Sequence, residues 1–109
     1  MSQVDDAAGL HVPVMLKEVI QYMKPRPGQV IADVTLGCGG HGSILLKEIS
    51  PGGLLIGIDR DPKALEIAGR ELSKIQSGRF LLFNDSFGNL PRVLEKAGHP
   101  AVDGILADL

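Results

Sequence analysis

The feature that most constrains the fold is a run of glycines between a short apolar stretch and a helical one. Residues Gly37-Cys38-Gly39-Gly40-His41-Gly42 have the spacing G-x-G-x-x-G. Glycines there allow positive φ angles and let the backbone approach a ligand that a Cβ atom would exclude. A helix that follows such a loop directs its first N–H groups at the ligand and favours a carboxylate or a phosphate. The pattern is weak alone in a chain with 14 glycines, but its place between a strand and a helix makes it specific.

The rest of the chain alternates short apolar runs with helical patterns. Buried strands are predicted over residues 29–34, 54–58, 80–83 and 104–107, and helices over 13–23, 42–49, 62–76 and 89–96. This alternation predicts an α/β fold, a Rossmann-like parallel sheet with helices on both faces. Residues 1–10 are expected to be flexible. Because no helix follows the fourth strand, residues 11–109 are expected to be the N-terminal half of a larger domain.

Composition and charge set limits on the function. The 109 residues are 44% hydrophobic and 22% charged, as in ordinary globular chains. The net charge of −2 gives no general attraction for phosphate backbones, so an RNA-binding surface would lie mostly elsewhere. A single cysteine excludes an internal disulfide and fits a reducing compartment. Since no secretory signal or apolar run of membrane-spanning length is found, we expect a cytoplasmic protein without a membrane partner.

Asp59 is the first acidic candidate for the ligand site. It ends the second predicted strand, 20 residues after Gly39. A dinucleotide or adenosyl fold places there a carboxylate that accepts both ribose hydroxyls. The alternative is that Asp59 caps the next helix together with Asp61. Asp61 stands directly before Pro62 and suits the cap better, which favours the ribose role for Asp59.

Asp33 bears on the choice of cofactor. It ends the first predicted strand, four residues before Gly37. A carboxylate beside the loop suits a cationic ligand and would repel a pyrophosphate, so it favours S-adenosylmethionine, a sulfonium, over a nicotinamide dinucleotide. The alternative, compatible with the first, is that Asp33 holds the loop through backbone amides. An NAD(P)-dependent oxidoreductase and a non-catalytic Rossmann-like interaction module stay open as other functions.

Four further residues carry weaker signals. Phe87 follows the third predicted strand and could flank an adenine ring or belong to the core. Asp108 ends the fourth strand at the same sheet edge, where a buried carboxylate is expected to have a function. His41 has no ligand-type neighbour at metal-binding spacing, so no metal is expected and His41 would shape the loop. Cys38 is interpreted as a small residue tolerated between glycines.

Four segments occur in an order and spacing similar to those of a known family. They are His11–Leu16 (HVPVML), Asp33–His41 (DVTLGCGGH), Gly57–Pro62 (GIDRDP) and Asp103–Leu109 (DGILADL). Together they resemble the RsmH (MraW) family, the bacterial small-subunit ribosomal RNA methyltransferases H. The resemblance runs from about residue 11 to residue 109, and Gly42 departs from it where the family commonly has serine or threonine.

The resemblance implies that S-adenosylmethionine methylates the N4 amine of a cytidine in 16S ribosomal RNA. It also implies that Gly39, Gly40 and His41 contact the methionyl end and Asp59 the ribose, with Phe87 and Asp108 as further cofactor contacts. The partner, 16S ribosomal RNA or the small ribosomal subunit, would bind through regions mostly outside this chain. The N4 amine is a poor nucleophile, so an acceptor for its proton would help, and Asp108 is the catalytic candidate. We expect these 109 residues alone to bind cofactor weakly and to be inactive on RNA.

Overall fold

The fold is built on four parallel strands in one sheet. The computed structural model describes residues 3–5, 11–13, 24–37 and 39–107. The sheet has the order β5-β4-β3-β6. Its strands are β3 (Val30–Asp33), β4 (Leu54–Asp59), β5 (Phe80–Asn84) and β6 (Gly104–Leu106). The predicted Rossmann-like α/β sheet is thereby confirmed, and each predicted strand is present within two residues of its expected bounds.

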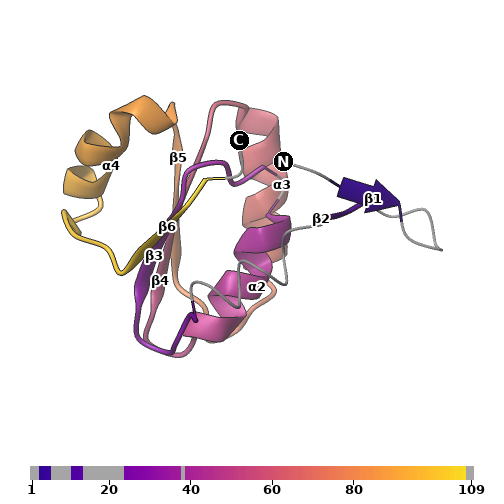
Figure 1. Cartoon of the computed structure of the whole chain (residues 1–109), viewed down its shortest axis with the longest axis horizontal. Coiled ribbons are helices and arrows are strands. Elements are labelled where there is room, and N and C mark those ends of the chain that lie inside the picture. Colours follow the sequence, from indigo (N-terminus) through magenta and orange to yellow (C-terminus); the bar gives the residue numbers. More distant parts are fainter. Residues whose placement is uncertain (1–2, 6–10, 14–23, 38, 108–109) are drawn as a thin grey trace.

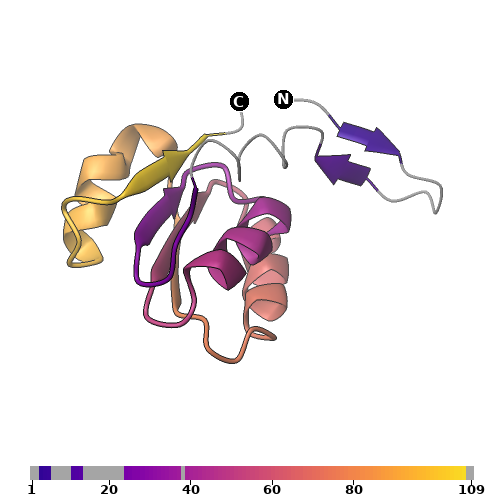
Figure 2. The same cartoon turned by 60° about the horizontal axis from the view of Figure 1, so that its bottom comes forward.

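Helices cover both faces of this sheet, as predicted. They are α2 (Gly40–Ile49), α3 (Pro62–Leu72) and α4 (Leu90–Lys96), with a 3₁₀ turn η1 (Phe87–Asn89) before α4. Figure 1 shows α2 and α3 together on one side of the sheet and α4 alone on the other. The view turned by 60° in Figure 2 shows the same three layers. In the part of the chain that the structure describes, the crossovers thus place two helices on one face and one helix on the other.

Each face has its own apolar core, because side chains alternate along the strands. Ile31 and Leu55 pack on the α2 and α3 side against Leu45, Ile49 and Leu72. The other core, on the α4 side, consists of Ala32, Val34, Leu54, Ile56, Ile58, Val93 and Leu94. The continuous apolar runs seen in the sequence are therefore explained by burial on both faces.

Two short strands near the N-terminus were not predicted. β1 (Gln3–Asp5) and β2 (His11–Pro13) pair antiparallel, with Val4 opposite Val12. This pairing gives regular structure to part of the segment expected to be flexible. The helix predicted after Pro13 lies in residues 14–23, which are outside the described part of the chain.

Helix α3 ends at Leu72, four residues before the predicted end. Ser73 donates hydrogen bonds to the carbonyl of Gly69 from its backbone N (3.0 Å) and from Oγ (2.6 Å). Tighter turns then bring the chain back to the sheet, with Ile75 N donating to Leu72 O (3.1 Å). The prediction extended the helix because no proline or glycine occurs in residues 73–76.

Gly53 offers a test of this packing. An alanine Cβ at Gly53 would meet Ile49 O and lie 2.7 Å from Gln29 O, both backbone atoms that cannot move away cheaply. We expect Gly53→Ala to lower the free energy of unfolding by about 2 kcal/mol or more, measured by urea denaturation.

Gly69→Ala is the matched control. A Cβ there would only touch Leu82 Cδ1 at 3.6 Å, and alanine suits the middle of a helix better than glycine. We expect this variant to be more stable by about 0.5–1 kcal/mol. A Gly53→Ala protein as stable as the wild type would show that the turn directly before β4 is not tightly packed.

Candidate functional site

The carboxylate of Asp59 joins the loop after β3 to the loop after β4. Asp59 ends β4, and its Oδ2 accepts a hydrogen bond from Gly37 N (2.8 Å). Its Oδ1 accepts a second hydrogen bond from Asp61 N (2.9 Å). A carboxylate has about four acceptor positions on its two oxygens, so each oxygen keeps one for a ligand. Asp59 is half-buried and can therefore hold the loop and bind a ligand at once.

The predicted cap of the following helix is confirmed. Asp61 is the N-cap of α3, and its Oδ1 accepts a hydrogen bond from Lys63 N (2.9 Å). Pro62 occupies the first helical position, as expected. Since Asp61 fills the cap, the side chain of Asp59 stays available for the glycine loop.

The glycine loop needs its glycines for two different reasons. Gly37 and Gly39 have φ angles of 58° and 90°, in the left-handed region that side chains with a Cβ rarely adopt. A Cβ on Gly39 would also lie 3.3 Å from both Cα and Cβ of Ala68 in α3. Gly39 is the N-cap of α2, and its carbonyl accepts a hydrogen bond from Ser43 N (2.8 Å). The loop thus lies tight against α3, and Gly40 begins α2 two residues before the predicted start.

Asp33 lies at the end of β3 beneath the loop. It is only 1% exposed, and its Oδ1 accepts a hydrogen bond from Thr35 N (3.1 Å). This bond fits the alternative that Asp33 holds the loop through backbone amides. The role of Asp33 toward a cationic ligand stays a prediction.

A cavity of about 240 Å³ opens beside Asp59 at this edge of the sheet. It is lined by Val34 and Thr35 after β3, by Asp59 and Arg60 after β4, and by Phe87 of η1. The structure thereby brings together two predicted site residues, Asp59 and Phe87, which are 28 positions apart. Phe87 is 53% exposed, so it is not a core residue of the described structure. The sequence analysis did not single out Val34, Thr35 or Arg60. Their positions directly after β3 and β4 could have indicated that they lie at this edge of the sheet.

Asp85 is a further acidic residue at this edge that had no predicted role. Its Oδ1 accepts hydrogen bonds from Asn89 Nδ2 (2.6 Å) and Ser86 N (2.8 Å). These bonds, first the one from Asn89, hold the pKa of Asp85 below its ordinary value of 3.8. Asp85 N also donates to Asp59 O (3.1 Å). Asp85 therefore fixes the turn that presents Phe87 to the cavity.

The remaining predicted site residues lie partly outside the described structure. Gly40 and His41 form the first turn of α2, with His41 8% exposed. Cys38 and Asp108 fall on residues that the structure does not describe, so the contact and catalytic roles of Asp108 stay predictions. Within the described residues, no three His, Cys, Asp or Glu side chains gather as metal ligands. Nor does that part of the chain contain a helix long and apolar enough to cross a membrane.

Comparison with known proteins identifies a family that matches this chain. Residues 8–109 match the family described as the MraW methylase family. The chain is 47% identical over 106 residues to the ribosomal RNA small subunit methyltransferase H of Dictyoglomus thermophilum, covering 97% of this chain and 35% of that protein. It is 48% identical over 99 residues to the protein of that name from Geobacter sulfurreducens, covering 91% and 32%. The chain thus spans about a third of the length of these relatives.

Solved structures share the fold. TrmN from Thermus thermophilus superposes with a TM-score of 0.68 and 28% identity, over 90% of this chain and 28% of that one. Aeropyrum pernix fibrillarin, solved in complex with natively bound S-adenosyl-L-methionine, gives a TM-score of 0.61 at 19% identity, over 76% and 34% of the two chains. At that identity the second likeness shows the fold alone.

The bond from Asn89 to Asp85 predicts a pH-dependent stability. A carboxyl group whose pKa is lowered in the folded state stabilises it above the unfolded pKa and loses this contribution as pH falls through the folded pKa. We expect Asn89→Ala to bring the pKa of Asp85 closer to 3.8, measured by NMR titration of its carboxyl carbon. The stability lost in this variant should be largest near neutral pH and shrink from about pH 5 downward.

Asn84→Ala is the control for that titration. Asn84 Nδ2 donates to a backbone carbonyl, Asp59 O (3.0 Å), so no titrating group accepts its bond. Its loss of stability should stay constant over the same pH range. A constant loss in Asn89→Ala as well would contradict the assigned cause of the Asp85 shift.

Proposed function

The chain belongs to the MraW methylase family, and we propose that it is the cofactor-binding part of an S-adenosylmethionine-dependent methyltransferase. Residues 11–109 would form the N-terminal part of the methyltransferase domain. The reaction we propose transfers a methyl group to the N4 amine of a cytidine in 16S ribosomal RNA. The named relatives are ribosomal RNA methyltransferases, which supports RNA as the substrate. Such an enzyme would work in the cytoplasm on RNA or on the small ribosomal subunit.

The observation that carries this proposal is the arrangement of Asp59. Two backbone N–H groups fix its carboxylate at the mouth of the 240 Å³ cavity. The acceptor positions that remain on Oδ1 and Oδ2 suit the two hydroxyls of a ribose, which are vicinal donors. We therefore assign the ribose to Asp59.

The cavity fits the adenosyl part of the cofactor. Phe87 is 53% exposed and supplies the accessible apolar surface that a purine ring requires, and Val34, which is 6% exposed, also lines the cavity. The volume is below the roughly 300–1,000 Å³ typical of pockets that enclose a drug-sized ligand. We therefore assign to this cavity only the adenosyl group, and place the rest of the cofactor along the glycine loop.

The methionyl end would lie at the glycine loop and the start of α2. Gly39, Gly40 and His41 surround the N-terminus of this ten-residue helix, where N–H groups favour a carboxylate. The close packing of Gly39 on Ala68 sets the depth of the loop. We assign these three residues to the methionyl group, with Gly37 shaping the turn and Asp33 giving the region beneath it negative charge.

The chain's own contribution to catalysis would be positioning. The bound cofactor would supply an electrophilic methyl group, and the fixed loop, Asp59 and Phe87 would set its direction. A proton must leave the N4 amine as the new bond forms, and an acceptor close to that amine would take it. We propose Asp108, two residues after the end of β6 in the sequence, as this acceptor and as a further cofactor contact.

The role of Asp59 can be tested with S-adenosylhomocysteine. We expect Asp59→Ala to weaken its binding about 10- to 100-fold in calorimetric titration, because two charge-assisted hydrogen bonds are lost. Asp61→Ala is the control: it removes the cap of α3 and should cost about 1 kcal/mol of stability. Its affinity should stay within about threefold of the wild type, since the Asp61 side chain bonds to Lys63 N.

A deoxy analogue separates direct contact from loop support. We expect removal of the ribose 2′-hydroxyl to weaken binding to the wild type but to cost little in Asp59→Ala, where its partner is already gone. An equal loss in both proteins would mean that Asp59 acts only through the loop and would withdraw the ribose assignment.

The substrate is tested on the RNA itself. We expect 16S ribosomal RNA from cells without the intact gene to lack one methyl group on a cytidine, seen as a mass difference in the nuclease fragment that carries it. Complementation with the intact gene should restore that methyl group, and complementation with the Asp59→Ala gene should restore it more slowly. An unchanged methylation pattern in the deletion strain would contradict the proposed substrate.

A further inference from the structure

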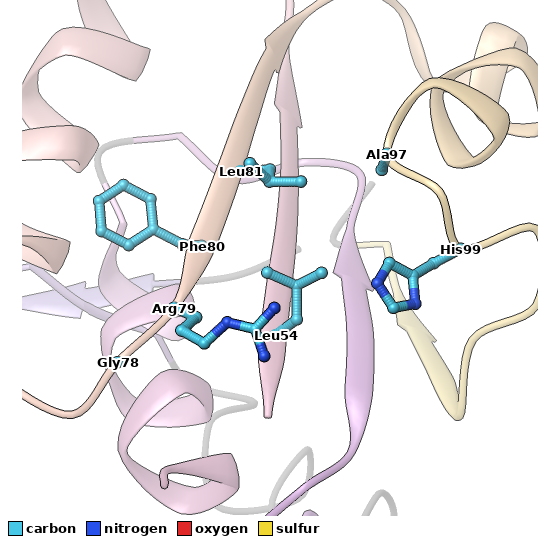
Figure 3. Close-up of a pocket in the computed structure, with 7 residues that line it drawn as sticks. All are labelled: Leu54, Gly78, Arg79, Phe80, Leu81, Ala97 and His99. Carbon is cyan, nitrogen blue, oxygen red and sulfur yellow. The ribbon is translucent and has the colours of Figure 1, made fainter. Parts of the chain in front are cut away.

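A second cavity lies at the opposite edge of the sheet from Asp59. Its volume is about 390 Å³, and its walls include Leu54, Arg79, Leu81, Ala97 and His99 (Figure 3). Leu54 begins β4 and Asp59 ends it, so five steps of about 3.3 Å, roughly 17 Å, separate the two sites. The second cavity therefore shares no residue with the adenosyl site.

The walls of this cavity combine apolar surface with two nitrogen-bearing side chains. Leu54 belongs to the core on the α4 side, while Leu81 is 40% exposed and supplies accessible apolar surface. In Figure 3 the side chains of Arg79 and His99 extend toward Leu54 from opposite sides. Both groups can donate hydrogen bonds into the space between them.

The fold places both donors there for local reasons. Arg79 directly precedes β5 and is two residues before Leu81, so the alternation along the strand puts both on the α4 face. His99 follows α4, where Gly98 has a φ of 77° and reverses the chain. His99 N then donates to Leu94 O (2.9 Å), which anchors the turn beside the sheet.

The charged and polar side chains that line this cavity are basic or neutral. None of the residues that line it is acidic. Within the described part of the chain, neither the Arg79 guanidinium nor the His99 imidazole has a hydrogen bond or an ion pair. Two other cations do form ion pairs: Arg70 on α3 with Glu66, and Lys74 after α3 with Glu71. The site thus offers donors without a competing carboxylate.

We propose that this cavity binds a nucleoside phosphate. The guanidinium fork of Arg79 matches two phosphate oxygens, and His99 can donate to the same group from the other side. Leu81, which is 40% exposed, would contact the base or the sugar. The volume lies within the range of about 300–1,000 Å³ typical of small-molecule sites, enough for a phosphate together with a ring. The inference rests on the residues of this cavity and not on the adenosyl site, so binding at one site can fail while binding at the other holds.

The same chemistry could come from a free mononucleotide or from one nucleotide of an RNA strand. Both present a phosphate next to a sugar and a base, and the strand adds further phosphates. A titration with cytidine 5′-monophosphate and one with a short single-stranded oligoribonucleotide separate these sources. If the oligonucleotide binds at Arg79 and His99 more tightly than the mononucleotide does, the ligand is an RNA strand. If the two bind equally tightly, the ligand is the mononucleotide.

NMR titration of the purified protein is the direct test. The chain has three histidines, so the ring signals of His99 can be resolved and assigned. We expect cytidine 5′-monophosphate to shift the His99 ring and the Arg79 Nε–H signals, and cytidine without phosphate to shift them at least tenfold less at equal concentration. The backbone signals of Gly39 and Asp59 report on the adenosyl site in the same spectra. Shifts confined to Gly39 and Asp59 would overturn the proposal.

Variants complete the test. We expect Arg79→Gln and His99→Gln each to weaken the mononucleotide affinity about tenfold or more, and Arg79→Lys to give an intermediate loss because the charge stays but the fork is gone. Arg70→Gln, which removes an exposed arginine on α3, is the matched control and should leave affinity unchanged. Equal affinity in Arg79→Gln and the wild type, or equal shifts with cytidine and its monophosphate, would overturn the assignment.

Discussion

The structure of the site depends on one carboxylate that accepts hydrogen bonds from two loops. Asp59 binds Gly37 N and Asp61 N, residues that follow neighbouring strands of the sheet. The contact of Gly39 with Ala68 and the bond from Thr35 N to Asp33 also hold the glycine loop, but the Asp59 carboxylate is the group that ties it to the loop after β4. A buried or half-buried backbone N–H that loses its acceptor costs free energy, so the carboxylate also stabilises the loop in the absence of ligand. The same group that would recognise a ribose therefore shapes the cavity in advance.

Parallel topology explains why the functional residues meet at one edge. The carboxyl ends of all four strands lie on the same side of the sheet. The carbonyl of Asp59 accepts a backbone hydrogen bond from Asp85 N, which continues the ladder, and a side-chain hydrogen bond from Asn84 Nδ2. These two bonds fix the start of the turn after β5, and the Asp85 carboxylate then orders the residues around Phe87. A chain with antiparallel strands would have divided the same residues between two edges. The local sequence around each residue matters less here than the direction of its strand.

Strand and helix periods in the sequence were enough to predict the sheet, the cap at Asp61 and the position of Asp59 at a strand end, because these depend on short-range patterns. The partner of Asp59 was not predictable, since Gly37 lies 22 residues away and only the folded sheet brings them together. The end of α3 was missed because the chain leaves the α-helix through bonds to the carbonyl three residues back, from Lys74 N and Ile75 N, and residues 73–76 contain no proline or glycine to signal this. The pairing of β1 with β2 and the cavity between Arg79 and His99 likewise depend on contacts between distant residues. The sequence allowed Asp33 two compatible roles, one toward a cationic ligand and one in holding the loop. The bond from Thr35 N supports the second role and does not test the first.

The unequal cover of the two sheet faces explains where the second cavity forms. A helix with its side chains is about 10 Å wide, while four strands at about 4.8 Å spacing extend across roughly 14 Å between the outer strand axes. Among the described residues, α2 and α3 cover one face, while α4 is the one helix on the other and covers its middle. The outer strands on that face carry the exposed side chains Leu81 and Ile105, 40% and 52% exposed. On the β5 side, Arg79 and His99 add hydrogen-bond donors to this apolar surface and a cavity forms. On the β6 side, Ile105 is exposed without such donors beside it in that cavity.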